Sequence, residues 1–149
     1  MKVSVHWLRK FVDIPESTAE LADLLTMLGF EAEIPESNWG NINIVSAKVI
    51  ECIPHPNADK LKLCKVDDGE GGKQVVCGAP NVRAGQNVAF ARLGTKFLNG
   101  FKIKTVKIRG SDSGGMICSE RELGISDEHE GIMVLDIHID PGLQLSKCI

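Results

Sequence analysis

The sequence predicts a mainly β protein with short helices, an α+β chain in which a small five-stranded barrel follows a two-helix N-terminal appendage. Two observations support this fold class. Residues 1–40 show the apolar spacing of short helices, whereas residues 41–149 contain short β-branched runs separated by turn sequences. The 149 residues suffice for one ordinary core and a small appendage, so two full-size domains do not fit.

The first forty residues are expected to form two amphipathic helices. The first begins at the capping residue Ser4 and ends before Pro15, and one face carries Trp7, Leu8, Phe11 and Val12. The second begins at a capping box formed by Ser17 and Glu20 and stops at Gly29. Its apolar residues are Leu21, Leu24, Leu25 and Leu28. Helices this short cannot bury such faces alone, so they need a partner surface.

A linker rich in turn-forming residues is expected at 35–41, and strands follow it. The expected strands are 42–53, 61–66, 74–77, 88–91, 102–108 and 132–135, and a short helix is expected at 120–123. Turn sequences separate these segments, and Asn99-Gly100 is typical of a tight hairpin. This pattern fits a small barrel such as an OB-fold, although periodicity alone does not separate a barrel from a small sandwich.

Charge is distributed unevenly along the chain. The formal net charge is −3, yet residues 71–111 hold eight basic residues and no acidic one. Residues 112–149 hold eight acidic residues and two basic ones. Local positive charge matters more than the total when the partner is a polyphosphate, so this stretch indicates a nucleic-acid partner.

The candidate RNA-binding residues lie in and around this basic stretch. They are His55, Asn57, Lys60, Lys62, Arg83, Lys102, Lys104, Lys107, Arg109 and Ser119. His55 stands between two prolines and is expected at the surface, either as a base or phosphate contact or as a polar turn residue. Asn57 could equally cap the local turn through its own backbone. On a strand over 102–108, Lys102 and Lys104 would face one side and Lys107 and Arg109 the other. The competing interpretation is that these lysines are solvated and protect a sheet edge.

Aromatic residues are scarce in the barrel region. It contains no Tyr, and beside Trp39 it offers Phe90, Phe97 and Phe101, some of which must fill the barrel. Stacking of bases on aromatic rings, worth about 1–3 kcal/mol per base, is therefore limited. Any RNA binding is expected to depend mainly on charge and shape and to weaken with salt.

No catalytic or metal-binding pattern is found in the sequence. A nucleophile elbow and a phosphate-cradling loop are both missing. The five cysteines have no zinc-ligand spacing and are expected to be buried thiols in a reducing compartment. No apolar run reaches the roughly 20 residues of a membrane span, and the N-terminus lacks the apolar core of a signal peptide. We therefore expect a cytoplasmic protein without a membrane, a metal or a cofactor of its own.

Several segments of the chain resemble a known family. Residues 54–68, 76–82 and 107–120 resemble the tRNA-binding OB domain shared by bacterial phenylalanyl-tRNA synthetase β subunits, methionyl-tRNA synthetase appendages and free-standing tRNA-binding proteins. Residues 1–29, together with 119–124 and 129–132, look like the β subunit itself. The resemblance implies a helical appendage over 1–40, the first half of a split domain, and a tRNA-binding OB domain over 41–149.

The resemblance also implies an accessory role in aminoacylation without catalysis. In that family the chemistry lies on a separate α subunit, the whole synthetase uses ATP and magnesium, and the β subunit continues through further domains. The expected partners are tRNA, the α subunit and the remainder of the β subunit in a heterotetramer, and the chain is interpreted as a fragment. Two alternatives stay open: a subunit-interaction module that binds no RNA, and a complete free-standing tRNA-binding protein.

Overall fold

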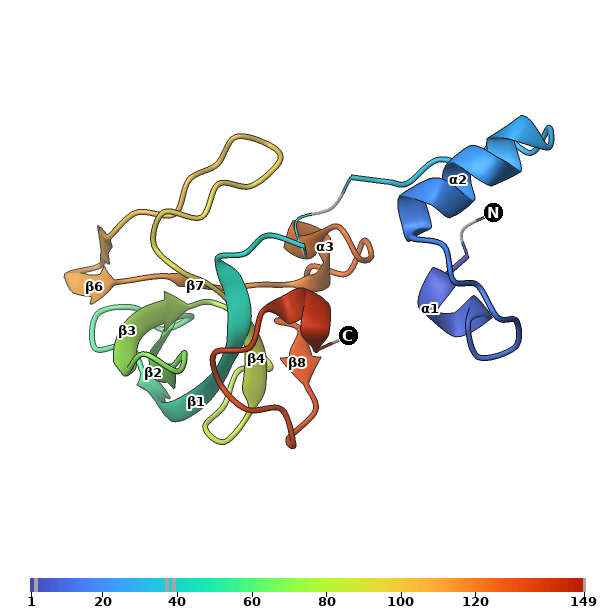
Figure 1. Ribbon diagram of the computed structural model, residues 1–149. Helices are drawn as coiled ribbons and strands as arrows, with labels where there is room; N and C mark the ends of the chain where they lie inside the picture. The colour runs from blue at the N-terminus through green and yellow to red at the C-terminus, as the bar shows by residue number, and fades with distance from the viewer. Residues whose placement is uncertain (2, 37, 39, 149) are drawn as a thin grey trace. The chain divides into compact units, whose positions relative to one another are not determined.

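The computed structural model describes residues 1, 3–36, 38 and 40–148, which form two compact units, Met1–Glu36 and Ser37–Ile149 (Figure 1). The division falls inside the segment predicted to be a linker. Ser37 and Trp39 of that segment lie outside the described residues, as do Lys2 and Ile149. Each unit is described by itself below.

The first unit contains helices α1 (Val5–Leu8) and α2 (Thr18–Met27). The Ser4 hydroxyl accepts the predicted capping hydrogen bond from the Trp7 amide at 3.2 Å. The prediction that Phe11 and Val12 belong to this helix is wrong, because α1 is one turn long and the chain then turns through bonds such as Phe11 N–H to Leu8 O.

Helix α2 has the predicted boundaries, and none of its residues is buried. The Glu20 amide donates to the Ser17 hydroxyl at 3.3 Å and the Ser17 amide donates to the Glu20 carboxylate at 2.8 Å, so the capping box is confirmed. Gly29 has φ of 92°, the left-handed conformation expected after a helix end. None of the described residues of this unit is buried.

The second unit is built on one curled antiparallel sheet. Its strands are β1 (Ile44–Pro54), β2 (Lys62–Asp67), β3 (Gly72–Cys77), β4 (Asn87–Ala91) and β7 (Met116–Ile117), in the order β3-β2-β1-β4-β7, and β8 (Val134–Leu135) also pairs with β4. The long β1 pairs with β4 along its first half and with β2 along its second. A register shift between Val49 and Glu51 marks where β1 bends, as a bulge does.

The sheet curls until its two ends nearly meet. Beyond the end of β6 (Ser111–Ser113), the Gly114 amide donates to the Gln74 carbonyl of β3 at 2.9 Å. The Ser113 hydroxyl accepts from the Val76 amide at 3.1 Å. This nearly closed barrel of β3, β2, β1, β4 and β7 confirms the predicted OB-like fold. The predicted helix α3 (Glu120–Leu123) follows β7, and a short 3-10 helix lies at Leu145–Lys147.

The predicted strand over 102–108 is wrong in its first half. Only β5 (Val106–Ile108) is a strand, and it pairs with β6 in a separate two-stranded sheet. Residues 94–103 instead fold on themselves, since the Phe97 amide donates to the Phe101 carbonyl and the Ile103 amide donates to the Thr95 carbonyl, both at 2.8 Å. The half that is a strand pairs with the neighbouring β6 and not with the barrel sheet.

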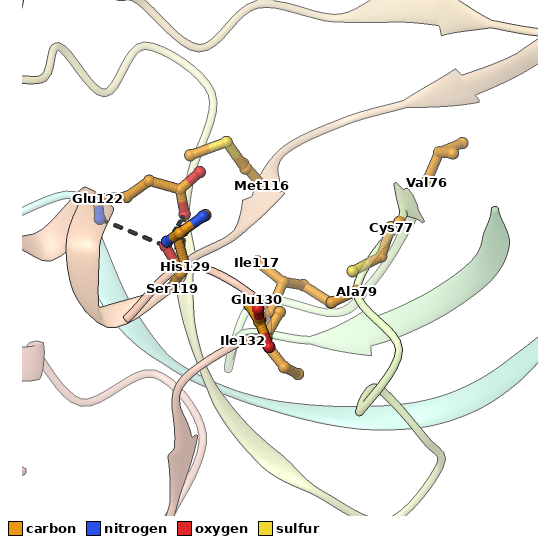
Figure 2. A pocket seen from close by; sticks show the side chains of 12 residues that line it. Val76, Cys77, Ala79, Met116, Ile117, Ser119, Glu122, His129, Glu130 and Ile132 are labelled. Carbon is orange, nitrogen blue, oxygen red and sulfur yellow. Dashed lines mark hydrogen bonds between the residues drawn. The ribbon is translucent and has the colours of Figure 1, made fainter. Parts of the chain in front are cut away.

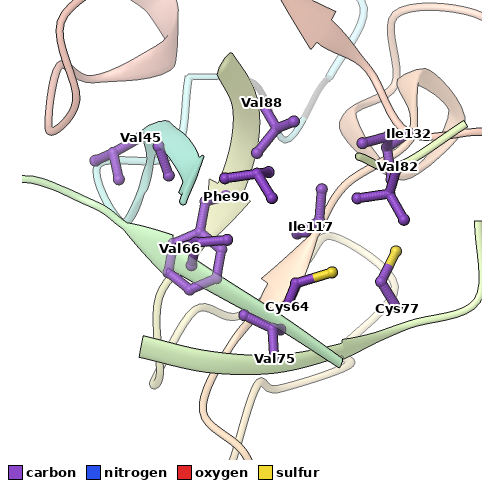
Figure 3. Close-up of a cluster of buried hydrophobic side chains, with 12 residues drawn as sticks. Val45, Cys64, Val66, Val75, Cys77, Val82, Val88, Phe90, Ile117 and Ile132 are labelled. Atoms are coloured by element: carbon purple, nitrogen blue, oxygen red, sulfur yellow. The ribbon is translucent and has the colours of Figure 1, made fainter. Parts of the chain in front are cut away.

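Strand β4 lies between two apolar clusters that form the core. The cluster inside the barrel includes Val66, Val75, Val88 and Phe90 (Figure 3). The second cluster contains Ala89 and Ala91 of β4 together with Ile44, Phe97, Ile103, Cys118, Leu123, Leu135 and Leu145. Both faces of β4 are therefore covered, and all five of its residues are buried.

The cysteines mostly act as small core side chains. Cys64, Cys77 and Cys118 are buried, while Cys52 and Cys148 are half-buried, and all five are free thiols. Burial raises the pKa of Cys64 and of Cys118, so both thiols stay protonated. Within the described residues, no helix is long and apolar enough to span a bilayer.

One buried carboxylate anchors the β2–β3 turn. Asp68 is fully buried and pairs with Lys73 and with Arg92, whose Nε lies 2.8 Å from Oδ2 of Asp68. Burial alone would raise the pKa of Asp68, but hydrogen bonds from Lys73 and Arg92 outweigh it and lower the pKa below its ordinary value. Two of the basic residues of the 71–111 stretch are thus used inside the fold.

Candidate nucleic-acid interface

Two segments that stand far apart in the sequence lie against each other in the second unit. The His55 ring is 3.1 Å from the Ile108 carbonyl, 53 positions along the chain. The Asn57 side-chain amide donates to the Arg109 carbonyl at 3.2 Å. These contacts join the loop 55–61 to the β5–β6 hairpin, 106–113, and we call the pair the joined loops.

His55 is buried, and its predicted surface position is wrong. Only 6% of it is exposed, because the β5–β6 hairpin covers it. Its Nδ1 accepts from the Asn57 amide at 3.0 Å, so Nε2 carries the proton and donates to the Ile108 carbonyl. Both ring nitrogens are engaged, and His55 therefore positions the joined loops instead of offering the ring to a ligand.

The turn between β5 and β6 has an unusual backbone at Arg109. Its φ is 52°, a left-handed value that costs a non-glycine residue roughly 1–2 kcal/mol. Gly110 follows with φ of 88°. The hydrogen bond from Asn57 holds this conformation from the opposite loop, and the Arg109 side chain is exposed. Ile108 pairs with Ser111, so Arg109 and Gly110 form a two-residue hairpin loop, and positive φ at both positions is what such a turn requires.

Positive charge gathers where the two loops meet. Lys60 and Arg109 line an open cavity of about 510 Å³, together with Asn57, Ala58, Asp59 and Leu61. Lys107 is also exposed, and its nearest acidic group, Asp112, lies 4.0 Å away in an equally exposed pair that contributes little. Lys60 and Arg109 are thus presented to solvent from two loops with fixed backbones, an arrangement suited to phosphate oxygens.

Two other candidates use their polar groups within the fold. The Lys62 ammonium donates to the Val82 carbonyl at 2.9 Å and to the Pro80 carbonyl at 3.3 Å. Ser119 is buried and caps α3, since its hydroxyl donates to the Glu122 carboxylate at 2.9 Å and accepts from the Glu122 amide at 3.4 Å. Both residues thus make contacts within the fold itself.

The remaining candidates lie in other loops. Arg83 is exposed in the turn between β3 and β4, and Lys102 and Lys104 are exposed in the loop between β4 and β5. The prediction that Lys102 and Lys104 share a strand with Lys107 and Arg109 is wrong, because residues 103–105 lie outside any strand. The candidate set omitted Lys96, which pairs directly with Lys102 through an isolated bridge.

A second, more acidic cavity lies where the barrel is not quite closed. It measures about 290 Å³, and Figure 2 shows Glu122, His129 and Met116 at one end and Val76 and Cys77 at the other. Carboxylates from Glu122 and Glu130 line it, so it does not suit a phosphate. Across the described part of the chain, no cluster of three or more His, Cys, Asp or Glu residues could hold a metal ion.

The curled barrel has an OB-like fold. Residues 44–144 match the family of putative tRNA-binding domains, and the chain belongs to this family. The fold is also similar to that of the MetRS related protein from Pyrococcus horikoshii, with a TM-score of 0.51 and 16% identity over 68% of this chain and 86% of that one. At this identity the likeness supports the fold alone.

Closer relatives are phenylalanine–tRNA ligase β subunits. The chain is 51% identical over 146 residues to that of Geobacter sulfurreducens and 50% identical over 146 residues to that of Oleidesulfovibrio alaskensis, in both cases over 97% of this chain and 18% of the relative. It is 46% identical over 154 residues to that of Chlorobaculum tepidum, over 99% of this chain and 19% of the relative. The chain thus spans about a fifth of the length of these relatives.

Proposed function

We propose that this chain is a tRNA-contacting accessory part of a phenylalanine–tRNA ligase β subunit and that the joined loops make the contact. Membership of a putative tRNA-binding family supports an RNA partner. The observation that carries the proposal is the pair of hydrogen bonds from His55 and Asn57 to the β5–β6 hairpin, which brings Lys60 and Arg109 to one cavity.

Binding at this surface depends on phosphate neutralisation. The Arg109 guanidinium can form two parallel hydrogen bonds to a phosphate, whereas the Lys60 ammonium acts as a point charge. Each neutralised phosphate releases counterions, so affinity falls as salt rises. Because the contacts reach the backbone of the RNA, they position the RNA without reading its sequence.

In this proposal, the aminoacylation reaction takes place on another chain of the enzyme. The relatives' name implies ligation of phenylalanine to tRNA, which we assign to a separate α subunit that uses ATP and magnesium in a cytoplasmic heterotetramer. The present chain then contributes RNA contact and assembly with the α subunit and the rest of the β subunit. Pyrophosphate exchange and deacylation assays on the purified chain are expected to show no turnover.

A subunit-interaction module without RNA binding is the second candidate function. One observation favours it: the unit 1–36 has no buried residue among those described and exposes several large apolar side chains. They include Trp7, Phe11, Leu24, Met27, Leu28 and Phe30. A surface of this kind marks a protein contact.

Titration of labelled tRNA at several salt concentrations separates the two candidates. We expect weak binding whose logarithm falls linearly with the logarithm of salt. Arg109→Gln removes one cation and should weaken binding and reduce the salt slope by about 1. Arg109→Lys keeps the charge at the same backbone position and should retain most of the slope. Lys48→Gln removes an exposed lysine of β1 outside the joined loops and is the matched control.

The outcomes are distinct. If tRNA fails to bind even at low salt, the subunit-interaction function is favoured. If Arg109→Gln and Lys48→Gln lower the slope equally, binding reflects total charge and the joined loops are not the site.

A further inference from the structure

The loop between β4 and β5 forms a narrow hairpin that projects from the barrel (Figure 1). Hydrogen bonds close it along its length, from the Gly94 amide to the Ile103 carbonyl at 2.8 Å and from the Phe97 amide to the Phe101 carbonyl at 2.8 Å. Gly100, at φ of 87°, completes the tip. The hairpin 94–103 therefore has a defined shape with two faces.

One face of this hairpin is basic. Lys96 and Lys102 are direct cross-strand partners, and partners of this kind project from the same face. Like charges placed directly opposite each other are destabilising. Among the ion pairs of the described residues, neither lysine takes part in any. Nearby Lys104 is exposed as well. A bound anion such as a phosphate would relieve this repulsion.

The other face is aromatic. The rings of Phe97 and Phe101 lie with centroids 6.4 Å apart and planes inclined by 25°, which is a stacked arrangement. Phe97 is buried, whereas 56% of Phe101 is exposed. Since Phe90 is fully buried, Phe101 is the exposed aromatic ring in the described part of this unit. The core thus supports a ring that remains open to solvent.

A cavity of about 510 Å³ adjoins this ring. Its apolar wall includes Leu98, Phe101 and Met116, and its polar side includes Arg121, Glu122 and His129, so the Glu122 carboxylate suits a neutral base in the cavity and not a phosphate. The volume lies within the range of roughly 300–1,000 Å³ that small-ligand sites occupy. His129 donates from Nδ1 to the Asp127 carbonyl at 3.2 Å, which leaves Nε2 as an acceptor. An apolar wall with a donor and an acceptor opposite suits the edge and face of a nucleobase.

We propose that this cavity holds one unpaired nucleobase of an RNA, stacked on Phe101, while the RNA backbone passes around the narrow hairpin so that Lys96 and Lys102 on its opposite face neutralise adjoining phosphates. The inference rests on the proposed function and adds a second contact to it, outside the joined loops. Stacking on an aromatic ring is tolerant of sequence because every base has a π face. An apolar side chain of a protein partner would use the ring but leave the lysine pair unneutralised, and for this reason RNA is the favoured occupant.

The test uses the whole chain and two single-stranded RNA probes of twelve nucleotides, one with bases and one with abasic ribose at every position. Both probes carry the same charge. Wild type should bind the base-containing probe roughly 5- to 100-fold more tightly, as expected for about one stacked base. Phe101→Ala and Phe101→Leu should both abolish this difference. Ile137→Ala removes an exposed apolar side chain that does not line the cavity and should preserve the difference.

Circular dichroism and thermal unfolding should show that each variant is folded, because the Phe101 ring is exposed. If both Phe101 variants keep the wild-type preference for bases, the inference is wrong, and the proposed function stands provided that Arg109→Gln weakens tRNA binding. If Phe101→Leu alone keeps the preference, the cavity accepts apolar groups generally and base stacking is wrong. If Phe101→Ala weakens binding while Arg109→Gln does not, the joined loops fail as a site and this inference survives.

Discussion

Each of the two units contains a helix that begins with a capping box, but only the helix in the second unit buries a side chain. Ser17 with Glu20 and Ser119 with Glu122 both form complete capping boxes. Helix α2 of the first unit has ten residues and buries none of them, whereas the four-residue α3 of the second unit ends on fully buried Leu123. Local hydrogen bonds therefore decide where a helix begins, and burial decides how much that helix contributes to stability.

The distribution of apolar surface extends this contrast. In the unit 37–149 both faces of β4 are covered by core side chains. In the unit 1–36 the apolar side chains stay exposed. We therefore expect cooperative stability to come from the second unit, and the first unit to need a partner surface. Three pairs of matched substitutions test this contrast.

The largest effect is expected from one pair of Phe→Ala substitutions. Phe90 is fully buried in the barrel, whereas 68% of Phe30 in the first unit is exposed. Phe90→Ala should lower the free energy of unfolding by about 3–5 kcal/mol because it leaves a cavity. Phe30→Ala should change it by less than about 0.5 kcal/mol. Urea unfolding followed by circular dichroism measures both, and equal losses would show that the first unit shares the core.

A smaller effect is expected from the buried carboxylate. Asp68→Asn weakens the pairing with Lys73 and Arg92, whose side chains stay 31% and 23% exposed and so keep some hydration. We expect a loss of about 1–3 kcal/mol in the free energy of unfolding. Glu20→Gln in the first unit, where the Ser17 hydroxyl lowers the pKa of an exposed carboxylate, should leave that transition unchanged.

The Asp68 effect should depend on pH in a defined direction. The pKa of Asp68 in the folded chain lies below its ordinary value of 3.8. Its carboxylate therefore contributes stability that is present above a pH of about 4 and is lost as pH falls through the folded-state pKa. The difference in the free energy of unfolding between wild type and Asp68→Asn should shrink as the pH is lowered below about 4. A difference that grows instead would show that Asp68 is not held as a carboxylate.

The smallest effect is expected from the two caps. Ser119→Ala should lower the free energy of unfolding of the second unit by about 1 kcal/mol. Ser17→Ala removes the same hydrogen bonds but should reduce only the helical signal of the first unit. Far-ultraviolet circular dichroism measures the helical signal, and urea titration measures the free energy of unfolding of the second unit. If Ser17→Ala shifts the urea unfolding transition of the second unit, α2 is energetically coupled to the barrel.

Much of the fold could be predicted because its signals are local. The strands β1 to β4 end at turn residues, as in the turn where Asp67 accepts a hydrogen bond from the Gly69 amide at 2.9 Å. The short strands β6 and β7 were missed, because two or three residues carry no readable period. Asn99-Gly100 correctly predicted a hairpin, but the alternation over 102–108 did not show that Lys102 and Ile103 belong to this hairpin and pair with Lys96 and Thr95.

The candidate site was predicted in part. The sequence identified the segments that meet, including Lys60 and Arg109, but it could not show that they meet. His55 was expected at the surface because its two neighbouring prolines predict an exposed loop, and the hairpin that buries it lies 53 positions away. The carbonyl partners of Lys62 are also distant in sequence. Non-local hydrogen bonds of this kind leave no local pattern.

Hydrogen exchange of the whole chain, with and without tRNA at low salt, tests the central claim most directly. Without RNA, amides of α1 and α2 should exchange much faster than those of β1 and β4, because a segment without buried residues opens locally. With tRNA bound, exchange should slow in the joined loops, 55–61 and 106–113, and stay unchanged over residues 5–28. Protection confined to residues 5–28 would contradict the account and assign the RNA contact to the helical unit.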